Sequence, residues 1–283
     1  YSAMPELPEV ETVRSGLEKY VLGKIICEAE SFHPRAIKSS SIAALSAVNG
    51  AKIIAVNRRG KFLWFELNRE VTLVAHLGMS GQLLVQPTLA TKQPHLRARV
   101  GLSNGIRSKK IRDEIRFIDQ RTFGWLSVEQ QSDGVPTCVA HIALDPFAKE
   151  FDIKQVVSKI KQKKTAIKPA LLSQAVVSGI GNIYADEGLW RARIHPEIIC
   201  EDLSEGEIKK VITSTVSVMK GAIKAGGTSF DEQYKNVNGE SGYFSRSLSV
   251  YGREGQPCSR CATAIRRIAF ANRSSHFCPR CQR

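Results

Sequence analysis

Residues 4–11 read Met-Pro-Glu-Leu-Pro-Glu-Val-Glu, and this stretch predicts both the first helix and the start of the chemistry. Pro8 suits the first turn of a helix because its missing N–H is not needed there, and the glutamates around it suit the positive end of the helix dipole. Apolar residues then recur at helical spacing up to a glycine at position 23: Val10, Val13, Leu17 and Val21. We therefore expect a helix that begins near Pro8, with Pro5 and Glu6 just ahead of its N-terminus.

Pro5 becomes a nucleophile if everything through Met4 is removed, because its ring nitrogen is then a secondary amine. Such an α-amino group has a pKa near ~8 and is partly unprotonated at neutral pH. Attack by this amine on a sugar aldehyde carbon gives a Schiff base, and Glu6 beside it can move protons. The alternative is an ordinary N-terminal tail whose proline starts a helix. We expect residues 1–4 to be an artificial extension; while they are attached, Pro5 is an amide.

Lysine and arginine outnumber aspartate and glutamate by 41 to 27, which gives the chain a formal net charge of +14. This excess favours a polyanionic partner, with nucleic acid ahead of a membrane surface, although a merely solvated basic surface gives the same balance. At 283 residues the chain can bury a sizeable core in one or two domains. Neither an apolar run of about 18 residues nor a signal segment occurs, so we expect a cytoplasmic protein without a membrane partner.

Four of the seven cysteines form two Cys-x-x-Cys pairs near the C-terminus: Cys258, Cys261, Cys278 and Cys281. Two tight turns of this spacing can close four thiolates tetrahedrally around one structural Zn²⁺. Two disulfides or redox-active thiols are the alternatives, and the lack of a secretory signal favours zinc. The other three cysteines are expected to be buried or idle thiols: Cys27, Cys138 and Cys200.

The pattern of short segments rich in branched and aromatic residues predicts an α+β protein that begins with an antiparallel two-sheet sandwich. The predicted strands are 24–30, 51–57, 61–67, 71–77, 81–85, 95–103, 106–117 and 123–128. Asn104-Gly105 between two of them predicts a two-residue hairpin. Helical periodicity follows after residues 136–146, with Ser204 as a cap of the last helix: 152–161, 168–177, 182–190 and 205–225.

Two glycine-bearing segments lie in the helical half. Ser178-Gly179-Ile180-Gly181-Asn182 opens a helix and can seat a phosphate on backbone N–H groups, although an ordinary helix connection has the same composition. The segment 226–244 is long and polar, and loops of this length are usually functional.

Four motifs in a fixed order closely resemble those of the formamidopyrimidine-DNA glycosylases, bacterial base-excision enzymes that remove oxidised purines. They are residues 4–11, His76-Leu77-Gly78-Met79-Ser80-Gly81, Gly181-Asn182-Ile183-Tyr184-Ala185 and the cysteine pairs. The resemblance spans nearly the whole chain from Met4. It implies an N-terminal two-sheet antiparallel β-sandwich, a C-terminal helix–two-turn–helix segment and a zinc β-hairpin, acting as a monomer on damaged double-stranded DNA in the bacterial nucleoid.

On this resemblance, residues 5–135 form the catalytic sandwich with its leading helix, and 136–150 form a linker. Residues 151–247 form the helical domain with a lesion-recognition loop at 226–244, and 248–283 form the zinc finger. The implied enzyme is a bifunctional glycosylase and lyase, which forms a Schiff base and then eliminates both flanking phosphates.

The resemblance also implies the catalytic residues. Pro5 would attack C1′ of the damaged nucleotide, and Glu6 would act as the acid at the sugar ring. Lys61 would steady a phosphate and serve the elimination; from spacing alone it is a solvated lysine at a strand end. Arg273 would grip a phosphate during the second elimination; without the resemblance it is an ordinary zinc-finger arginine.

A base inside a duplex is out of reach of such chemistry, so it must be flipped out and its place filled. The resemblance assigns the filling to Met79, Arg121 and Phe123, since apolar wedges unstack a base step and an arginine can satisfy the orphaned partner base. From the residues alone, Met79 and Phe123 would be core residues. Three further positions match residues that hold the DNA backbone, although for the lysine a solvated charge is the default: His95, Lys164 and Asn182.

The sequence departs from the family's usual pattern in two places, and two other functions are alternatives to the one that the resemblance implies. Thr122 stands where many relatives carry a second basic residue, and the segment 106–112 is longer and more basic than usual. A non-catalytic zinc protein that binds DNA or RNA would share the charge and the cysteines, but it has no use for the Pro5-Glu6 pair. An enzyme for oxidised pyrimidines, as in endonuclease VIII, is disfavoured by residues 4–11 and by the 226–244 loop.

Overall fold

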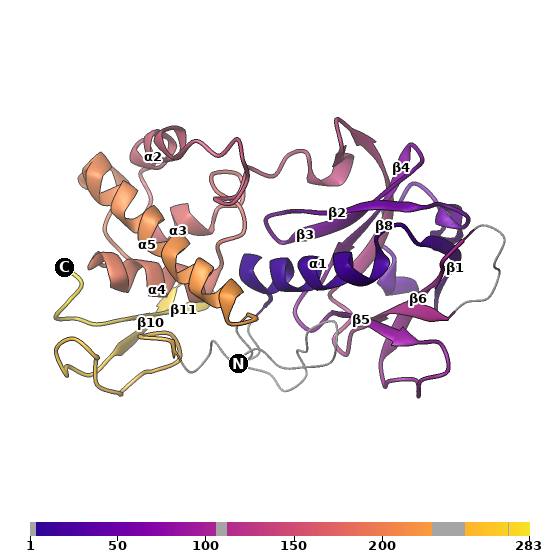
Figure 1. Ribbon diagram of the computed structural model, residues 1–283. Helices are drawn as coiled ribbons and strands as arrows, with labels where there is room; N and C mark the ends of the chain where they lie inside the picture. Colours follow the sequence, from indigo (N-terminus) through magenta and orange to yellow (C-terminus); the bar gives the residue numbers. More distant parts are fainter. Residues whose placement is uncertain (1–3, 106–111, 228–246, 271) are drawn as a thin grey trace. The chain divides into compact units, whose positions relative to one another are not determined.

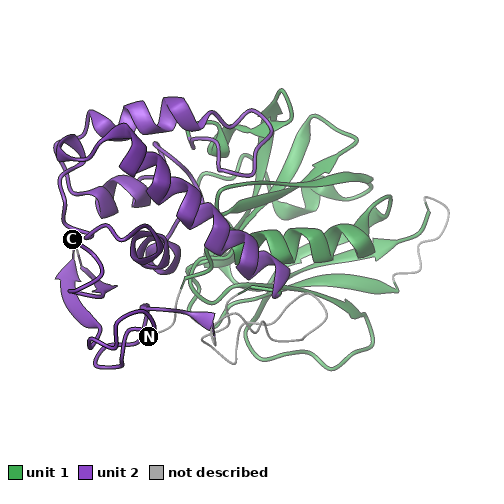
Figure 2. Cartoon of the chain, turned by 60° about the vertical axis from the view of Figure 1, so that its left-hand side comes forward, with its two compact units in different colours: residues 1–141, 226–243 green, residues 142–225, 244–283 purple. Residues whose placement is uncertain are grey.

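The computed structural model describes residues 4–105, 112–227, 247–270 and 272–283. The chain divides into two compact units, coloured separately in Figure 2. The first unit comprises Tyr1–His141 and Gly226–Tyr243, and the second comprises Ile142–Ala225 and Phe244–Arg283. The first carries the two larger sheets, and the second carries helices and a small hairpin (Figure 1).

Helix α1 (Leu7–Val21) opens the first unit and confirms the predicted helix. Glu6 is its N-cap and forms a capping box with Glu9, whose Oε2 accepts the backbone N–H of Glu6 at 2.9 Å. This arrangement satisfies N–H groups that the first helical turn leaves without partners. One face of the helix is buried in the core: Leu7, Val10, Val13, Leu17 and Val21. Burial of each such side chain contributes about 1.5–3 kcal/mol to folding.

Two antiparallel sheets form the predicted sandwich. The five-stranded sheet has the order β2-β3-β4-β8-β9, with bounds β2 (Ile53–Arg59), β3 (Phe62–Leu67), β4 (Val71–His76), β8 (Trp125–Ser132) and β9 (Val135–Pro136). The four-stranded sheet has the order β1-β6-β7-β5, with bounds β1 (Ile25–Ser31), β6 (Leu96–Ser103), β7 (Asp113–Ile118) and β5 (Gln82–Pro87). One apolar cluster joins both sheets and α1, and includes Val13, Phe65 and Phe117.

The hairpin expected at Asn104-Gly105 is wrong in its register. A two-residue loop there would pair Ser103 with Ile106, whereas Leu102 pairs with Asp113. The start of the predicted strand, residues 106–111, lies outside the described residues. The register instead places apolar residues of β7 such as Phe117, which is 1% exposed, in the core. Core burial fixes the strand register more strongly than a local turn preference does.

The second unit contains α2 (Ile153–Lys161), α3 (Ile167–Leu172), α4 (Asn182–Ala192) and α5 (Glu205–Lys224). The predicted cap of α5 is confirmed, since Ser204 and Glu207 form a capping box. Helix α3 ends earlier than predicted, because the Gln174 side chain donates to the carbonyls of Leu172 and Ile180 and holds a turn.

Strands β10 (Arg266–Phe270) and β11 (Arg273–Phe277) form an antiparallel pair beside the cysteine turns. Short 3₁₀ segments, which the sequence patterns did not predict, are η1 (Pro34–Ala36), η2 (Leu45–Val48), η3 (Thr137–Val139) and η4 (Cys200–Asp202). Among the described residues, no helix combines the length and the apolar character needed to cross a membrane.

Candidate functional site

Pro5 and Glu6 are both buried at the beginning of α1, and Glu6 is only 3% exposed. The chain returns to this point at Gly227, where a Cβ would lie 3.6 Å from the Cα of Glu9. Gly227 has a φ of +90°, a conformation that glycine adopts without strain. The stem of the predicted lesion-recognition loop 226–244 therefore starts beside the N-terminus of α1, while residues 228–244 lie outside the described part of the chain.

Lys61 lies in the tight turn between β2 and β3, which the pairing of Arg59 with Phe62 closes. Arg58 anchors this turn: one guanidinium nitrogen donates to the carbonyl of Gly60 at 3.1 Å, and Nε donates to Glu11 Oε2 at 2.9 Å. Glu11 belongs to α1, so one guanidinium group joins the turn of Lys61 to the helix that follows Pro5. A 2.9 Å ion pair with low exposure of the Arg58 side chain holds this geometry.

His76 is a site residue that the sequence reasoning missed, although it begins the quoted motif 76–81. It lies directly opposite Phe62 on β3 and Trp125 on β8, with ring centroids at 4.8 and 5.5 Å. Burial, together with the charges of Lys61 and Lys38, lowers the pKa of His76 to about 4. The imidazole is therefore neutral at pH 7. Since its Nδ1 accepts the N–H of Gly78 at 3.2 Å, the ring proton is assigned to Nε2.

Asp119 joins the loops that carry the three predicted inserting residues. Its buried carboxylate accepts the Ser80 hydroxyl at 2.5 Å, the Arg121 N–H at 3.1 Å and the Gly124 N–H at 2.8 Å. Its backbone N–H donates to the carbonyl of His95 at 3.0 Å. One side chain thus organises loops that begin far apart in sequence, and the sequence reasoning did not select it.

Glycines let the same two loops touch backbone to backbone. A Cβ on Gly78 would lie 2.4 Å from the nitrogen of Gly124, so no larger residue fits there without a backbone shift. The loops leave Met79 half-buried and Arg121 exposed, and Phe123 is 56% exposed. The interpretation of Phe123 as a core residue is therefore wrong, because most of its ring faces solvent.

In the second unit, side chains of α3 and α4 hold the start of β11. Asn182 is the first residue of α4, and its amide nitrogen donates to the carbonyl of Ser274 at 3.0 Å. The fully buried Lys168 donates to the same carbonyl and pairs with Asp186 at 2.6 Å. Asp186 in turn accepts the hydroxyl of Ser275 at 2.9 Å.

These contacts fix the backbone next to two of the predicted phosphate-binding residues. Arg273 is exposed at the start of β11, directly before the anchored Ser274, and pairs with Phe270 across the hairpin. Within the described residues, Oδ1 of Asn182 is buried without a hydrogen-bond partner. Lys164, another residue predicted to bind the DNA backbone, is exposed in the connection between α2 and α3. Arg273 and Asn182 are thus brought to one anchored region, where the exposed guanidinium of Arg273 can present donors.

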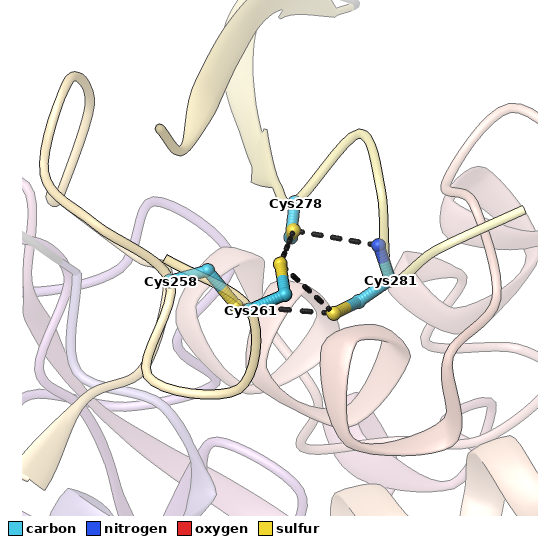
Figure 3. A group of neighbouring side chains, drawn as sticks. All are labelled: Cys258, Cys261, Cys278 and Cys281. Atoms are coloured by element: carbon cyan, nitrogen blue, oxygen red, sulfur yellow. Dashed lines mark hydrogen bonds between the residues drawn. The ribbon is translucent and has the colours of Figure 1, made fainter. Parts of the chain in front are cut away.

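The four predicted zinc ligands converge from two turns (Figure 3). Their Sγ atoms all lie within 4.8 Å of one another; Cys261 and Cys278 are 3.4 Å apart, and Cys258 and Cys281 are 4.0 Å apart. A tetrahedral Zn²⁺ with bonds of about 2.3 Å requires sulfur separations of about 3.8 Å, so these residues fit the ion. All seven cysteines are free, which excludes the two-disulfide alternative. Four protein ligands leave no position for a reactive water, so the site is structural.

Three family profiles match the chain in order. They are the formamidopyrimidine-DNA glycosylase N-terminal domain over residues 4–126, the H2TH domain of the same enzymes over 142–233, and the zinc finger found in FPG and IleRS over 255–283.

Relatives and solved structures agree with these profiles. A protein of Rhodococcus jostii named formamidopyrimidine-DNA glycosylase is 52% identical over 99% of this chain and 96% of the relative, and one of Nocardioides sp. is 49% identical over 99% and 94%. The crystal structure of the MutM (Fpg) protein of Thermus thermophilus superposes with a TM-score of 0.85, at 35% identity over 98% of each chain. A Lactococcus lactis Fpg in complex with DNA containing an abasic site superposes with a TM-score of 0.83, at 33% identity over 98% of this chain and 99% of that one.

Proposed function

We propose, from the premise that the chain belongs to the formamidopyrimidine-DNA glycosylase family, that it excises oxidised purines from duplex DNA with Pro5 as the nucleophile. The chain is a DNA glycosylase of base-excision repair with a structural zinc site. The alternative of a non-catalytic nucleic-acid-binding protein is therefore wrong. One observation carries the proposal: Pro5 and Glu6 are buried together at the N-terminus of α1, next to the stem of the 226–244 loop.

The first step forms a covalent bond to the sugar. The nitrogen of Pro5, once it is a free amine, attacks C1′ while the bond from C1′ to the base breaks. The base leaves with the electron pair of that bond, and the proton that the Pro5 nitrogen loses balances the proton that the base takes up. Glu6 protonates the ring oxygen as the sugar opens, which leaves a C1′ iminium. Because the proline nitrogen is secondary, this iminium carries a permanent positive charge and attracts electrons from the neighbouring carbon.

The iminium then drives two eliminations. Loss of a proton from C2′ gives an enamine that expels the 3′ phosphate. Loss of a second proton, from C4′, then expels the 5′ phosphate. We assign Lys61, which lies in the anchored β2–β3 turn, to one of these phosphates, and Arg273 to the phosphate that leaves second. A charged donor stabilises the negative charge that develops on a departing phosphate. The neutral His76 adds an N–H donor beside Lys61 without adding a charge.

Flipping requires something to replace the extruded base. Phe123 and Met79 serve as apolar wedges, and Arg121 pairs with the base opposite the lesion. The exposure of Phe123 supports this role, because a solvent-facing aromatic ring on a loop braced by Asp119 is available to enter a base step. His95, Lys164 and Asn182 would hold the DNA backbone, and the protein would act as a monomer in the bacterial cytoplasm.

Borohydride trapping tests the nucleophile. A chain that begins at Pro5 should form a reducible covalent adduct with a duplex that carries 8-oxoguanine, and the chain that retains residues 1–4 should not. The matched control is Glu6→Gln in the shortened chain, which keeps the amine; it should lose excision yet still be trapped on a preformed abasic site, where no base has to leave. Equal trapping by the long and short chains would show that Pro5 is not the nucleophile.

A further inference from the structure

A basic hollow lies beside the zinc-binding turns of the second unit, and the proposed chemistry does not use it. Its volume is about 640 Å³, and two of its lining residues are the zinc ligands Cys261 and Cys281. The other lining residues are all arginines: Arg193, Arg260, Arg280 and Arg283. Within the described part of the chain, no acidic side chain lines this hollow.

The charge of the zinc site does not account for these arginines. A Zn²⁺ ion with four thiolates has a net charge of −2, which balances two guanidinium groups and leaves two in excess. Arg260 is already fixed, because its guanidinium lies 3.6 Å from the ring centre of Trp190 and donates to the Trp190 carbonyl at 2.6 Å. Among the residues that the structure describes, the guanidinium groups of Arg193 and Arg280 have neither an ion-pair nor a hydrogen-bond partner.

The hollow lies away from two residues to which the proposed function assigns DNA contacts, Asn182 and Arg273. Trp190 lies in the last turn of helix α4 and Arg193 is its C-cap, whereas Asn182 begins the helix, whose 11 residues span about 16 Å. The cysteine turn at Cys278 follows the end of β11, whereas Arg273 begins this five-residue strand. Both elements therefore place the hollow at the end away from Asn182 and Arg273; this step rests on the proposed function.

We propose that this hollow binds an acidic peptide segment of a partner protein. The planar guanidinium fork matches carboxylates in a bidentate manner, and the forks of Arg193, Arg280 and Arg283 around one hollow can take several carboxylates of one peptide. Duplex DNA is contacted along a groove or over an extended surface, whereas this hollow is lined by only six residues. Single-stranded DNA binds through aromatic faces on which bases stack, and the nearby Trp190 face is covered by Arg260.

The test uses the full chain with its zinc and a fluorescein-labelled hexa-aspartate peptide, with a hexa-asparagine peptide as the neutral probe. Fluorescence anisotropy should show binding of the acidic peptide alone, weakened by added salt. The variant Arg193→Gln/Arg280→Gln should raise the Kd at least tenfold. The control Arg191→Gln/Arg266→Gln removes the same charge from two exposed arginines that do not line the hollow, and should change the Kd less than threefold.

Three outcomes would overturn the inference. Equal weakening by both double variants would mean that the peptide senses only the overall charge. Displacement of the peptide by undamaged duplex DNA, with duplex affinity lost in Arg193→Gln/Arg280→Gln, would assign the hollow to nucleic acid. Displacement by inorganic phosphate at millimolar concentration would reduce it to a small-anion site.

The peptide measurement needs no lesion and no excision, so it stays informative if the assignment of Pro5 fails. Conversely, Arg193→Gln/Arg280→Gln should retain normal single-turnover excision and its full zinc content. If this double variant lost zinc, its weaker peptide binding could result from a disturbed fold. The single variant Arg193→Gln, whose residue lies outside the cysteine turns, then tests the proposal, and it should also raise the Kd for the acidic peptide.

Discussion

Replacement of Phe123 by alanine should slow base excision while it changes the stability of the fold very little. Removal of a core phenylalanine costs about 3–5 kcal/mol, but that value applies to a fully buried ring. Phe123 is 56% exposed, so less than half of its surface is removed from water, and solvent rather than a cavity fills the vacated space. We therefore expect a loss of about 1 kcal/mol in the free energy of unfolding.

The effect on excision should be larger, because the wedge compensates for an unstacked base step. Unstacking costs a few kcal/mol per step, and each 1.4 kcal/mol corresponds to a factor of ten, so excision should slow roughly 10- to 100-fold. The assay is single-turnover excision of 8-oxoguanine from a duplex, beside urea unfolding of the same preparation. The same lesion in a single strand should be affected much less, because no stack has to be replaced.

Phe117→Ala provides the matched control, since this ring is 1% exposed in the core of the same unit. It should lose about 3–5 kcal/mol of stability and keep its excision rate per folded molecule. The wedge assignment would be refuted if Phe123→Ala lowered stability as much as Phe117→Ala and left excision unchanged.

Three further predictions address the bracing carboxylate, the metal and pH. Asp119→Asn turns one acceptor into a donor that faces a backbone N–H. It should therefore lower the free energy of unfolding, measured in urea, by about 1.5–3 kcal/mol and also slow excision. If neither value changed, Asp119 would not brace these loops. Cys261→Ser should lose zinc and DNA affinity together, by metal analysis and anisotropy, and tight lesion binding by metal-free protein would contradict this. The folded-state pKa of His76 lies below its unfolded value, so its stabilising contribution is complete above pH 6.5 and is lost as the pH falls toward 4. Between pH 7 and pH 5, the free energy of unfolding of the wild type, measured in urea, should thus fall by on the order of 2 kcal/mol more than that of His76→Gln. If the two proteins showed the same dependence of stability on pH, the lowered pKa of His76 would be refuted.

Local patterns in the sequence determined the elements whose causes are local. Helix α1 follows from its apolar spacing and its acidic first turn, and α5 follows from a cap and a glutamate three residues apart. The zinc site follows from two Cys-x-x-Cys turns, because each turn orients its own pair of thiols. These interactions connect residues within about one helical turn or one tight turn, which is the range over which a sequence pattern carries physical information.

Only the tertiary structure decided the features that depend on distant segments. The register of β6 and β7 follows from burial in a core shared with other strands, and it overrode the turn signal of Asn104-Gly105. The contacts of Asp119 reach Ser80, which is 39 positions away, and the lowered pKa of His76 depends on Lys61 in the β2–β3 turn and on Lys38 after η1. The exposure of Phe123 and the position of Arg193 beside the cysteine turns have the same origin. A side chain's burial and charge environment are set by whichever segments the sheets and helices bring beside it, and no local pattern encodes those neighbours.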